Sequence, residues 1–411
     1  MLLRSGQVLV QDRERTRFCP LDLRVLGDVI VAMEEHLEPK GGEEVISVEG
    51  KWVLPGLIDA HVHTAGLFGD VDPYRNKDMG VAEVALRAAH SARKHLWSGF
   101  TSLRDLGGRD YVDVALRKAI NEGLVIGPRM FVSGRALCMT GGHASQLLRS
   151  REIDGRDEAR RGARAQIAES VDQIKVMATG GGISPTGGLG VSQLSLEELT
   201  VIVEEARKAG KRVAAHAHGL EGIRNAMKAG VDSIEHGTFA DEEALVEMAR
   251  RGLYLVVCIG ATAFMASNQA VAAGLPGFMH EKCKVLLLAQ ERTFRKACEL
   301  EVPIAFGSDC GTPLNPPGRT TREFEFLVKN GMTKAQAINA ATIEAAKLIG
   351  VEDQIGSLEA NKKADILVLN HNPLQDIGVL MNPEEEIYYL FKDGLMVNLP
   401  PATSYRDRKI R

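Results

Sequence analysis

The sequence predicts an α/β protein: a (β/α)8 barrel of the TIM type, with a small β-sandwich domain formed from both ends of the chain. Two observations support this fold. The long middle of the 411-residue chain alternates apolar strands with helices, and β-rich segments flank it on both sides. A chain of this length exceeds one hydrophobic core, so a large domain with a smaller one is expected. We assign residues 1–55 and 355–411 to the composite β-sandwich domain and residues 56–354 to the barrel.

Short β-rich runs with polar breaks occur at both ends of the chain. The runs near the N-terminus cover residues 7–10, 21–26 and 29–33, and those near the C-terminus cover residues 364–369 and 386–391. Runs of this length and composition indicate a small sheet rather than helices. Because they flank a long middle, we expect both groups to join one sheet.

The middle of the chain contains eight strand-then-helix units. The expected strands are residues 57–63, 100–105, 129–133, 173–178, 212–216, 232–236, 254–258 and 304–308, and the clearest helices are residues 81–96, 196–209, 222–229 and 281–301. Apolar strands that alternate with helices indicate a parallel sheet. Eight such units favour a closed barrel with active residues at the carboxyl ends of the strands. An open doubly wound sheet is the alternative, but no G-x-G-x-x-G follows the first strand.

Two long segments after strands are expected to lie over the mouth of the barrel. Residues 179–188 are rich in glycine but lack the Gly-Lys-Ser/Thr of a phosphate-binding loop, so we interpret them as a long mobile loop. Residues 260–280 are a candidate specificity loop. Four large apolar residues there, Phe264, Met265, Phe278 and Met279, suit either substrate contact or packing.

Composition excludes several classes of function. Hydrophobic residues make up 45% and charged residues 25%, and the net charge of −4 offers no basic face for nucleic acid and no polybasic membrane anchor. The six cysteines include no C-x-x-C pair, which suits a reduced cytoplasm better than a disulfide framework. No signal peptide or membrane span is apparent. The expected protein is soluble and cytoplasmic, with no nucleic-acid or membrane partner.

Histidines and one aspartate end several of the expected strands. His61 and His63 are two residues apart on a strand, so both side chains point to one face and could bind one ion. His216 and His236 close the fifth and sixth strands, and Asp309 follows the eighth. A strand-end histidine is often only a satisfied polar residue, and Asp309 could simply cap a turn. Together these residues favour a metal site.

Lys175 lies inside the apolar fourth strand. An ordinary role would be a salt bridge at the strand end, because an ammonium group cannot bind a metal. Burial beside two cations would lower its pKa. The neutral amine could then combine with carbon dioxide, and the resulting carbamate could bridge two metal ions.

Several motifs resemble the amidohydrolase superfamily. The run P-G-L-I-D-A-H-V-H at residues 55–63 is similar to its opening signature, and E-H-G-T at 235–238 and G-S-D-C-G-T at 307–312 resemble its sixth and eighth strands. Residues 356–369 resemble its C-terminal sandwich strands. Within the superfamily, residues 140–143 and 174–181 resemble the imidazolonepropionase-related branch, which contains binuclear Xaa-Pro dipeptidases and Xaa-Arg carboxypeptidases.

The resemblance implies a site and an activity. It implies His61, His63, Lys175 and Asp309 around one metal, and Lys175, His216 and His236 around the other, with carboxylated Lys175 bridging. The histidine-rich ligand set favours two Zn²⁺ ions. His143 would polarise the substrate carbonyl, and Asp309 would move the proton of the attacking metal-bridging hydroxide. The expected reaction is hydrolysis of an amide bond in a dipeptide or N-acyl-L-amino acid, by an enzyme that assembles as a homo-oligomer.

Some alternatives remain open. Many relatives have Ala-Tyr after the fifth-strand histidine, whereas this chain has Ala217-His218. His218 could contact the substrate, compete as a ligand or begin the next helix; we assign it to substrate binding. The alternative functions are a hydrolase of small ureas, carbamates or cyclic amides, a mononuclear deaminase and a metal-free structural relative.

Overall fold

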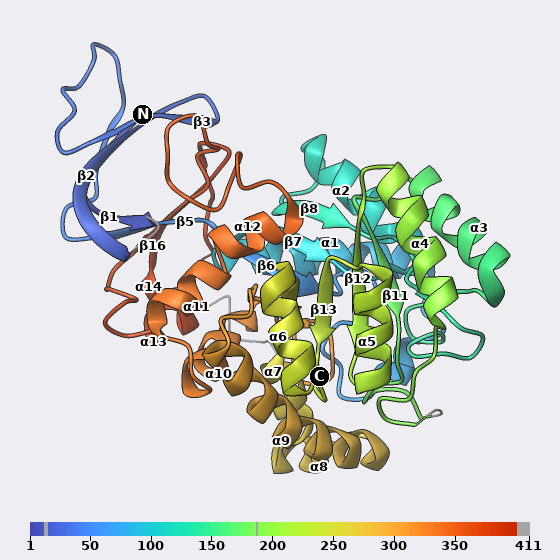
Figure 1. Ribbon diagram of the computed structural model, residues 1–411. Helices are drawn as coiled ribbons and strands as arrows, with labels where there is room; N and C mark the ends of the chain where they lie inside the picture. Colours follow the sequence, from blue (N-terminus) through green and yellow to red (C-terminus); the bar gives the residue numbers. More distant parts are fainter. Residues whose placement is uncertain (12–14, 186–187, 401–411) are drawn as a thin grey trace.

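The computed structural model describes residues 1–11, 15–185 and 188–400. Both ends of the chain meet in one eight-stranded sheet at one end of the molecule (Figure 1). Its strands follow the order β17-β16-β15-β5-β1-β2-β3, and β4 pairs with β1. They are β1 (Leu2–Gln11), β2 (Thr16–Leu26), β3 (Val29–Glu34), β4 (Val45–Ser47), β5 (Trp52–Pro55), β15 (Ile366–Leu369), β16 (Ile387–Lys392) and β17 (Leu395–Met396). The predicted sheet from both chain ends is therefore confirmed.

The two chain ends are joined by the antiparallel pair of β5 and β15, in which Val53 lies opposite Val368. The sheet also curls, because the far strand β3 bonds to the segment that leads into β15. The amide of Ala364 donates to the carbonyl of Asp28, and the amide of Ile30 donates to that of Lys362. The curled sheet encloses its own apolar cluster, to which Val53 and Val368 belong. This gives the sandwich-like form that was expected.

The middle of the chain forms two sets of parallel strands, one in the order β6-β7-β8 and the other in the order β10-β9-β11-β12-β13-β14. The strands are β6 (Leu57–Val62), β7 (Phe100–Asp105), β8 (Arg129–Val132), β9 (Leu137–Cys138), β10 (Arg151–Glu152), β11 (Gln173–Met177), β12 (Arg212–Ala217), β13 (Ser233–His236) and β14 (Tyr254–Val256). Hydrogen bonds join the two sets, since the amide of Asp172 donates to the carbonyl of Val132. The α/β class is confirmed, and seven expected strands lie within two residues of their predicted ends.

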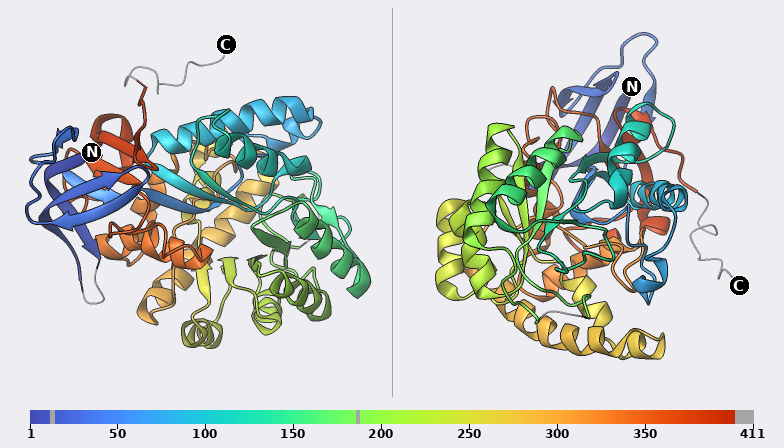
Figure 2. Two further views of the ribbon diagram at one scale, coloured as in Figure 1. Left: turned by 90° about the horizontal axis from the view of Figure 1, so that it is seen from above. Right: turned by 90° about the vertical axis from the view of Figure 1, so that its right-hand side faces the viewer.

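Most of the helices follow the parallel strands and cover the outside of their sheets (Figure 2). The helices are α1 (Val81–Trp97), α2 (Val112–Asn121), α3 (Gly155–Ala168), α4 (Leu196–Lys208), α5 (Leu220–Ala229), α6 (Glu242–Arg251), α7 (Ile259–Met265), α8 (Asn268–Ala272), α9 (Gly277–Glu299), α10 (Glu323–Lys329), α11 (Lys334–Ala340), α12 (Ile343–Ile349), α13 (Gly378–Met381) and α14 (Pro383–Glu386). Of these, α13 and α14 lie between β15 and β16 in the chain. Local signals explain their ends. Ser195 and Glu198 form a capping box at the start of α4, and Gly230 ends α5 in the left-handed conformation. Among the residues that the structure describes, no helix is both long and apolar enough to cross a membrane.

The eighth expected strand, residues 304–308, is not a regular strand. Ile304 makes an isolated bridge to Leu255, and Cys310 just after the segment makes one to Val62, so the segment still lies between β14 and β6. The carboxylate of Asp59 replaces part of the ladder, because it accepts hydrogen bonds from the amide and the hydroxyl of Ser308. Backbone bonds, such as that from the amide of Ala60 to the carbonyl of Phe306, and these side-chain bonds together hold the segment in place.

The expected specificity loop at residues 260–280 is mostly helical. The carboxylate of Glu323 accepts hydrogen bonds from the amides of Ile259 and Gly260 and so caps α7, and the Ser267 side chain caps α8. Met279 is buried and does not line the pocket described below, which supports a packing role for it, whereas Met265 is buried against that pocket. In the glycine-rich segment after β11, Thr179 pairs with Ser192; Thr186 and Gly187 of that segment lie outside the described residues, as do residues 401–411.

Candidate metal centre and active site

One pocket at the carboxyl ends of the parallel strands contains every site residue that the sequence nominated. His61 and Lys175 lie on β6 and β11, and His216 and His236 lie on β12 and β13. The loops that follow the strands add the others. The eight nominated residues that line the pocket are His61, His63, His143, Lys175, His216, His218, His236 and Asp309. We call them the pocket floor.

One group of possible metal ligands consists of His61, His236 and Asp309, whose ligand atoms all lie within 4.8 Å of one another. The Oδ1 atom of Asp309 is 3.5 Å from Nε2 of His61 and 3.3 Å from Nε2 of His63. His236 and Asp309 both have left-handed backbone conformations, with φ of 71° and 52°. Such conformations are rare outside glycine and often occur at functional sites. Four side chains thus converge on one small volume.

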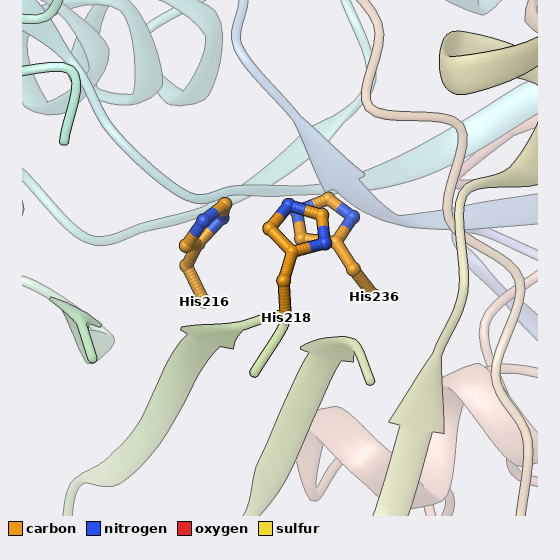
Figure 3. Close-up of side chains that lie close together, drawn as sticks. All are labelled: His216, His218 and His236. Carbon is orange, nitrogen blue, oxygen red and sulfur yellow. The ribbon is translucent and has the colours of Figure 1, made fainter. Parts of the chain in front are cut away.

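A second group consists of His216, His218 and His236, again with ligand atoms within 4.8 Å of one another (Figure 3). The rings of His218 and His236 are stacked 4.7 Å apart, and the ring of His216 stands edge-on to both. The helix α5 begins only at Leu220, so His218 does not start that helix. Its Nδ1 atom lies 2.8 Å from the hydroxyl of Thr238, and this contact holds the ring in the pocket. His236 belongs to both groups.

Lys175 lies in the floor between polar side chains, yet its ammonium nitrogen has no hydrogen-bond partner among the described residues. The side chain is 1% exposed. Burial lowers the pKa of Lys175 to about 8, because the charged form loses hydration. The Nε2 atom of His216 is buried and equally unpartnered. Buried nitrogen atoms without partners are costly, so this donor set fits a bound cation and a modified lysine.

Burial favours the neutral form of several histidines of the floor. It lowers the pKa of His61 to about 4 and those of His143 and His236 to about 3. Burial alone would raise the pKa of Asp309, but the neighbouring His61 and His63 outweigh it and hold that pKa well below its usual range. Near neutral pH the floor therefore offers imidazole lone pairs and one carboxylate, which are the forms that bind metal.

Two functional side chains that the sequence reading missed lie beneath the floor. Glu235 lies 2.8 Å from Nδ1 of His61 and accepts a 2.9 Å hydrogen bond from Arg104. Burial would raise the pKa of Glu235, but the charge of Arg104, the hydrogen bond with His61 and the charge of Lys175 together outweigh it and lower that pKa. The ionised carboxylate accepts a hydrogen bond from the Nδ1–H of His61, so the proton stays on Nδ1 and Nε2 presents its lone pair toward Asp309. The available signals were Arg104 inside an apolar strand and Glu235 beside His236.

His143 is oriented by Ser184, which the sequence reading also missed. The Ser184 hydroxyl accepts a hydrogen bond from the amide of Ala144 and lies 2.9 Å from Nδ1 of His143. The Ala144 amide uses one acceptor position of the oxygen and leaves the hydroxyl proton free to point at Nδ1, and we assign it there. His143 then carries its own proton on Nε2, the nitrogen near the position that a Cβ atom on Gly181 would occupy. The ring is stacked on His216 at 4.2 Å and offers a hydrogen-bond donor to the pocket.

Residues 52–397 match the model of the Amidohydrolase family. The chain belongs to the amidohydrolase family. The similar proteins described below share most of this fold. The pocket floor therefore belongs to a hydrolase that acts on C–N bonds.

Three relatives are similar to this amidohydrolase over most of its length. The ochratoxinase of Aspergillus niger is 35% identical over 378 residues, which is 85% of this chain and 76% of the relative. A prolidase crystallised with N-methylphosphonate-L-proline matches with a TM-score of 0.89 and 30% identity, covering 97% of this chain and 99% of that one. A Xaa-Pro dipeptidase with methionine bound in its active site matches with a TM-score of 0.87 and 33% identity, over the same shares.

Proposed function

We propose that this amidohydrolase cleaves the amide bond of a dipeptide or an N-acyl-L-amino acid. The observation that carries the proposal is the convergence of His61, His236, Asp309 and Lys175 in one buried floor. The similar prolidase supports the substrate class, because it binds a phosphonate on the nitrogen of proline. A tetrahedral phosphorus at that position has the shape of the intermediate in amide hydrolysis, and enzymes bind such shapes tightly.

We propose a binuclear centre of two divalent ions, of which Zn²⁺ suits the histidine-rich donors. His61, His63 and Asp309 would hold one ion, and His216 and His236 would hold the other. The neutral amine of Lys175 would add to carbon dioxide and release one proton, and the carbamate would bridge both ions. Bound ions of this kind supply an activated water near neutral pH and polarise a carbonyl group.

The side chains of the floor perform the proton transfers. Asp309 is ionised near neutral pH and accepts the proton of the attacking water. It then delivers this proton to the departing nitrogen, because an amine leaves readily only when protonated. His143 donates its Nε2 proton as a hydrogen bond to the carbonyl oxygen, on which negative charge develops.

His218 contacts the substrate in this proposal. Its position among His216 and His236 also favours a second role, as a ligand of the same ion. The variant His218→Ala separates these roles. Retained metal with a raised KM indicates substrate contact, and loss of metal indicates ligation.

The decisive experiment combines metal analysis with a substrate screen. We expect about two equivalents of metal per chain and hydrolysis of members of a library of dipeptides and N-acyl amino acids. Aryl ureas, carbamates, lactams and amino-purines are screened beside them, with ammonia release as a separate readout. Asp309→Asn should lower kcat about 100-fold or more, and metal analysis of the same variant reports how far the lost carboxylate also weakens metal binding. A preference for ureas or lactams, ammonia release with one metal, or full activity of Asp309→Asn would contradict the proposal.

A further inference from the structure

Apolar side chains border the polar pocket floor on two sides. They come from the loops after β6, β9 and β11 and from α7 and α9, and all are buried. We call this set the apolar wall; it consists of Leu67, Leu148, Ile183, Met265, Cys283 and Leu286. All but Leu286 belong to one hydrophobic cluster that is separate from the core of the parallel strands. The wall is therefore a packed surface rather than a chance exposure of single residues.

Contacts at two glycines place the wall against the floor. The position of a Cβ atom on Gly107 would lie 3.2 Å from Leu148 and 3.3 Å from His63, so these two side chains are neighbours. On the other side, a Cβ atom on Gly182 would lie 3.3 Å from Leu286. The preceding Gly181 lies against His143 and His216 in the same way. Wall and floor side chains are therefore neighbours at both places, and both line one pocket.

The wall contains no charged group. Among the pocket-lining side chains of the described part of the chain, the charged ones are Lys175 and Asp309, and both belong to the floor. Lys282 lies at the rim, where its ammonium donates a 2.7 Å hydrogen bond to the carbonyl of Ser184. A charged substrate side chain against the wall would lose its hydration without gaining a partner. An apolar side chain there would gain free energy as water leaves both surfaces.

We propose that the apolar wall selects substrates in which the side chain next to the scissile amide is large and apolar, such as leucine, methionine or phenylalanine. This inference rests on the proposed amide hydrolysis and gives it a substrate class. It excludes lysine and arginine side chains at that position, because the wall offers no carboxylate to receive them.

The test compares side chains on the unaltered, metal-loaded protein. N-acetyl-L-amino acids and dipeptides that carry Leu, Met, Phe, Ser, Lys or Glu next to the amide are assayed for kcat/KM. Binding of the same N-acetyl amino acids to the metal-free protein is measured by calorimetry. We expect Leu, Met and Phe to exceed Ser, Lys and Glu at least about tenfold in both measurements, since hydrophobic pockets discriminate by such factors. The substrates with a Glu side chain test whether the ammonium group of Lys282 can form an ion pair with a substrate carboxylate at the rim.

Variants on α9 provide a matched pair. Leu286→Glu places a carboxylate in the wall and should shift the preference toward Lys, whereas Leu288→Glu changes a side chain on the same helix that is 74% exposed and should shift nothing. Leu286→Met keeps the wall apolar. This variant shows whether a change of side chain at position 286 alters folding or activity even when no charge is introduced. Circular dichroism and thermal unfolding identify any variant that has failed to fold, and the comparison on unaltered protein does not depend on these variants.

The outcomes separate the inference from the proposed function. If substrates with Lys or Glu side chains are hydrolysed with a kcat/KM equal to or greater than that of the Leu, Met and Phe substrates, the proposed selectivity of the wall is wrong. The proposed amide hydrolysis would be unaffected by that result. If no library member is hydrolysed but apolar compounds still bind best, the wall is supported and the proposed function is contradicted. Neither hydrolysis nor apolar-selective binding would overturn both.

Discussion

The Nδ1 atom of His61 donates a 2.8 Å hydrogen bond to Oε2 of Glu235, and both side chains are shielded from solvent. The other oxygen of this carboxylate accepts a hydrogen bond from Arg104. The three residues form a buried chain of charge and hydrogen bonds that ends at the pocket floor. The chain fixes which nitrogen of His61 faces the proposed metal.

Replacing Glu235 by glutamine should weaken metal binding. The amide is a poorer acceptor for the proton of His61 and leaves the charge of Arg104 without its partner. Changes of this kind typically cost about 10- to 100-fold in metal affinity. Competition with a chromophoric chelator measures the affinity. Glu169→Gln, which changes an exposed carboxylate at the C-terminal end of α3, is the control, and equal affinities in the two variants would remove Glu235 from this role.

Replacing Lys175 by alanine should remove at least one metal ion and nearly all activity, because the bridging group is lost. A short carboxylate such as propionate fits the space of the missing carbamate and should restore part of both. Metal analysis and turnover are measured with and without added carboxylate. Lys228→Ala on α5 alters an exposed lysine and should retain full metal and activity. Unchanged metal content in Lys175→Ala would show that this lysine is not a bridging ligand.

Replacing Ser184 by alanine should release the ring of His143 from its fixed tautomer. The donor at Nε2 is then present only part of the time, and we expect kcat to fall about tenfold or more while KM changes little. Nitrogen NMR of labelled histidine reports the tautomer directly. Ser184→Thr keeps the hydroxyl and should restore the rate, and Ser192→Ala at the other end of the loop is the control. An unaltered nitrogen spectrum in Ser184→Ala would contradict the assignment.

Glu205 links α3 to α4, because it accepts hydrogen bonds from Arg164 and Lys208. These bonds lower the pKa of Glu205 to about 2 from an ordinary value of 4.5. A carboxylate whose pKa is lower in the folded state stabilises the protein above the unfolded-state pKa, and this stabilisation is lost as pH falls through the folded-state value. Glu205→Gln should therefore lower the midpoint of urea unfolding at pH 7.

The difference between Glu205→Gln and the unaltered protein should be fully present above about pH 4.5 and should narrow as pH falls toward 2. Urea titrations at several pH values measure it. Glu204→Gln changes an exposed neighbour on the same helix and serves as the control. A difference that does not depend on pH would show that the glutamate acts through packing rather than charge.

Strand periodicity predicted most of the parallel strands and the residues at their ends. The pattern succeeds because apolar runs and strand-end histidines are local features of the chain. It failed at residues 304–308, where Asp59 replaces ladder bonds from far away in sequence. It also missed the pairing of Arg104 with Glu235, which joins two different strands. Whether two side chains on different strands meet depends on how the strands are arranged around the pocket. The sequence pattern of a single strand does not predict that arrangement.

Other predictions concern features that the fold does not test. The division of the chain at residues 55 and 355, the homo-oligomer and the cytoplasmic location stay predictions. The assignment of each ligand to an ion belongs to the proposed function. The positions of His61, Lys175 and Asp309 in one floor agree with that assignment because they bring the necessary donors together.

The antiparallel pairing of Val53 with Val368 has a consequence for synthesis of the chain. Strand β5 leaves the ribosome about 300 residues before its partner, which at ordinary rates is a wait of roughly 15 to 60 s. During that interval the apolar faces of β1 and β5 lack the strand that covers them. We therefore expect the nascent N-terminal sheet to bind a chaperone. Its release from the chaperone should coincide with the synthesis of β15.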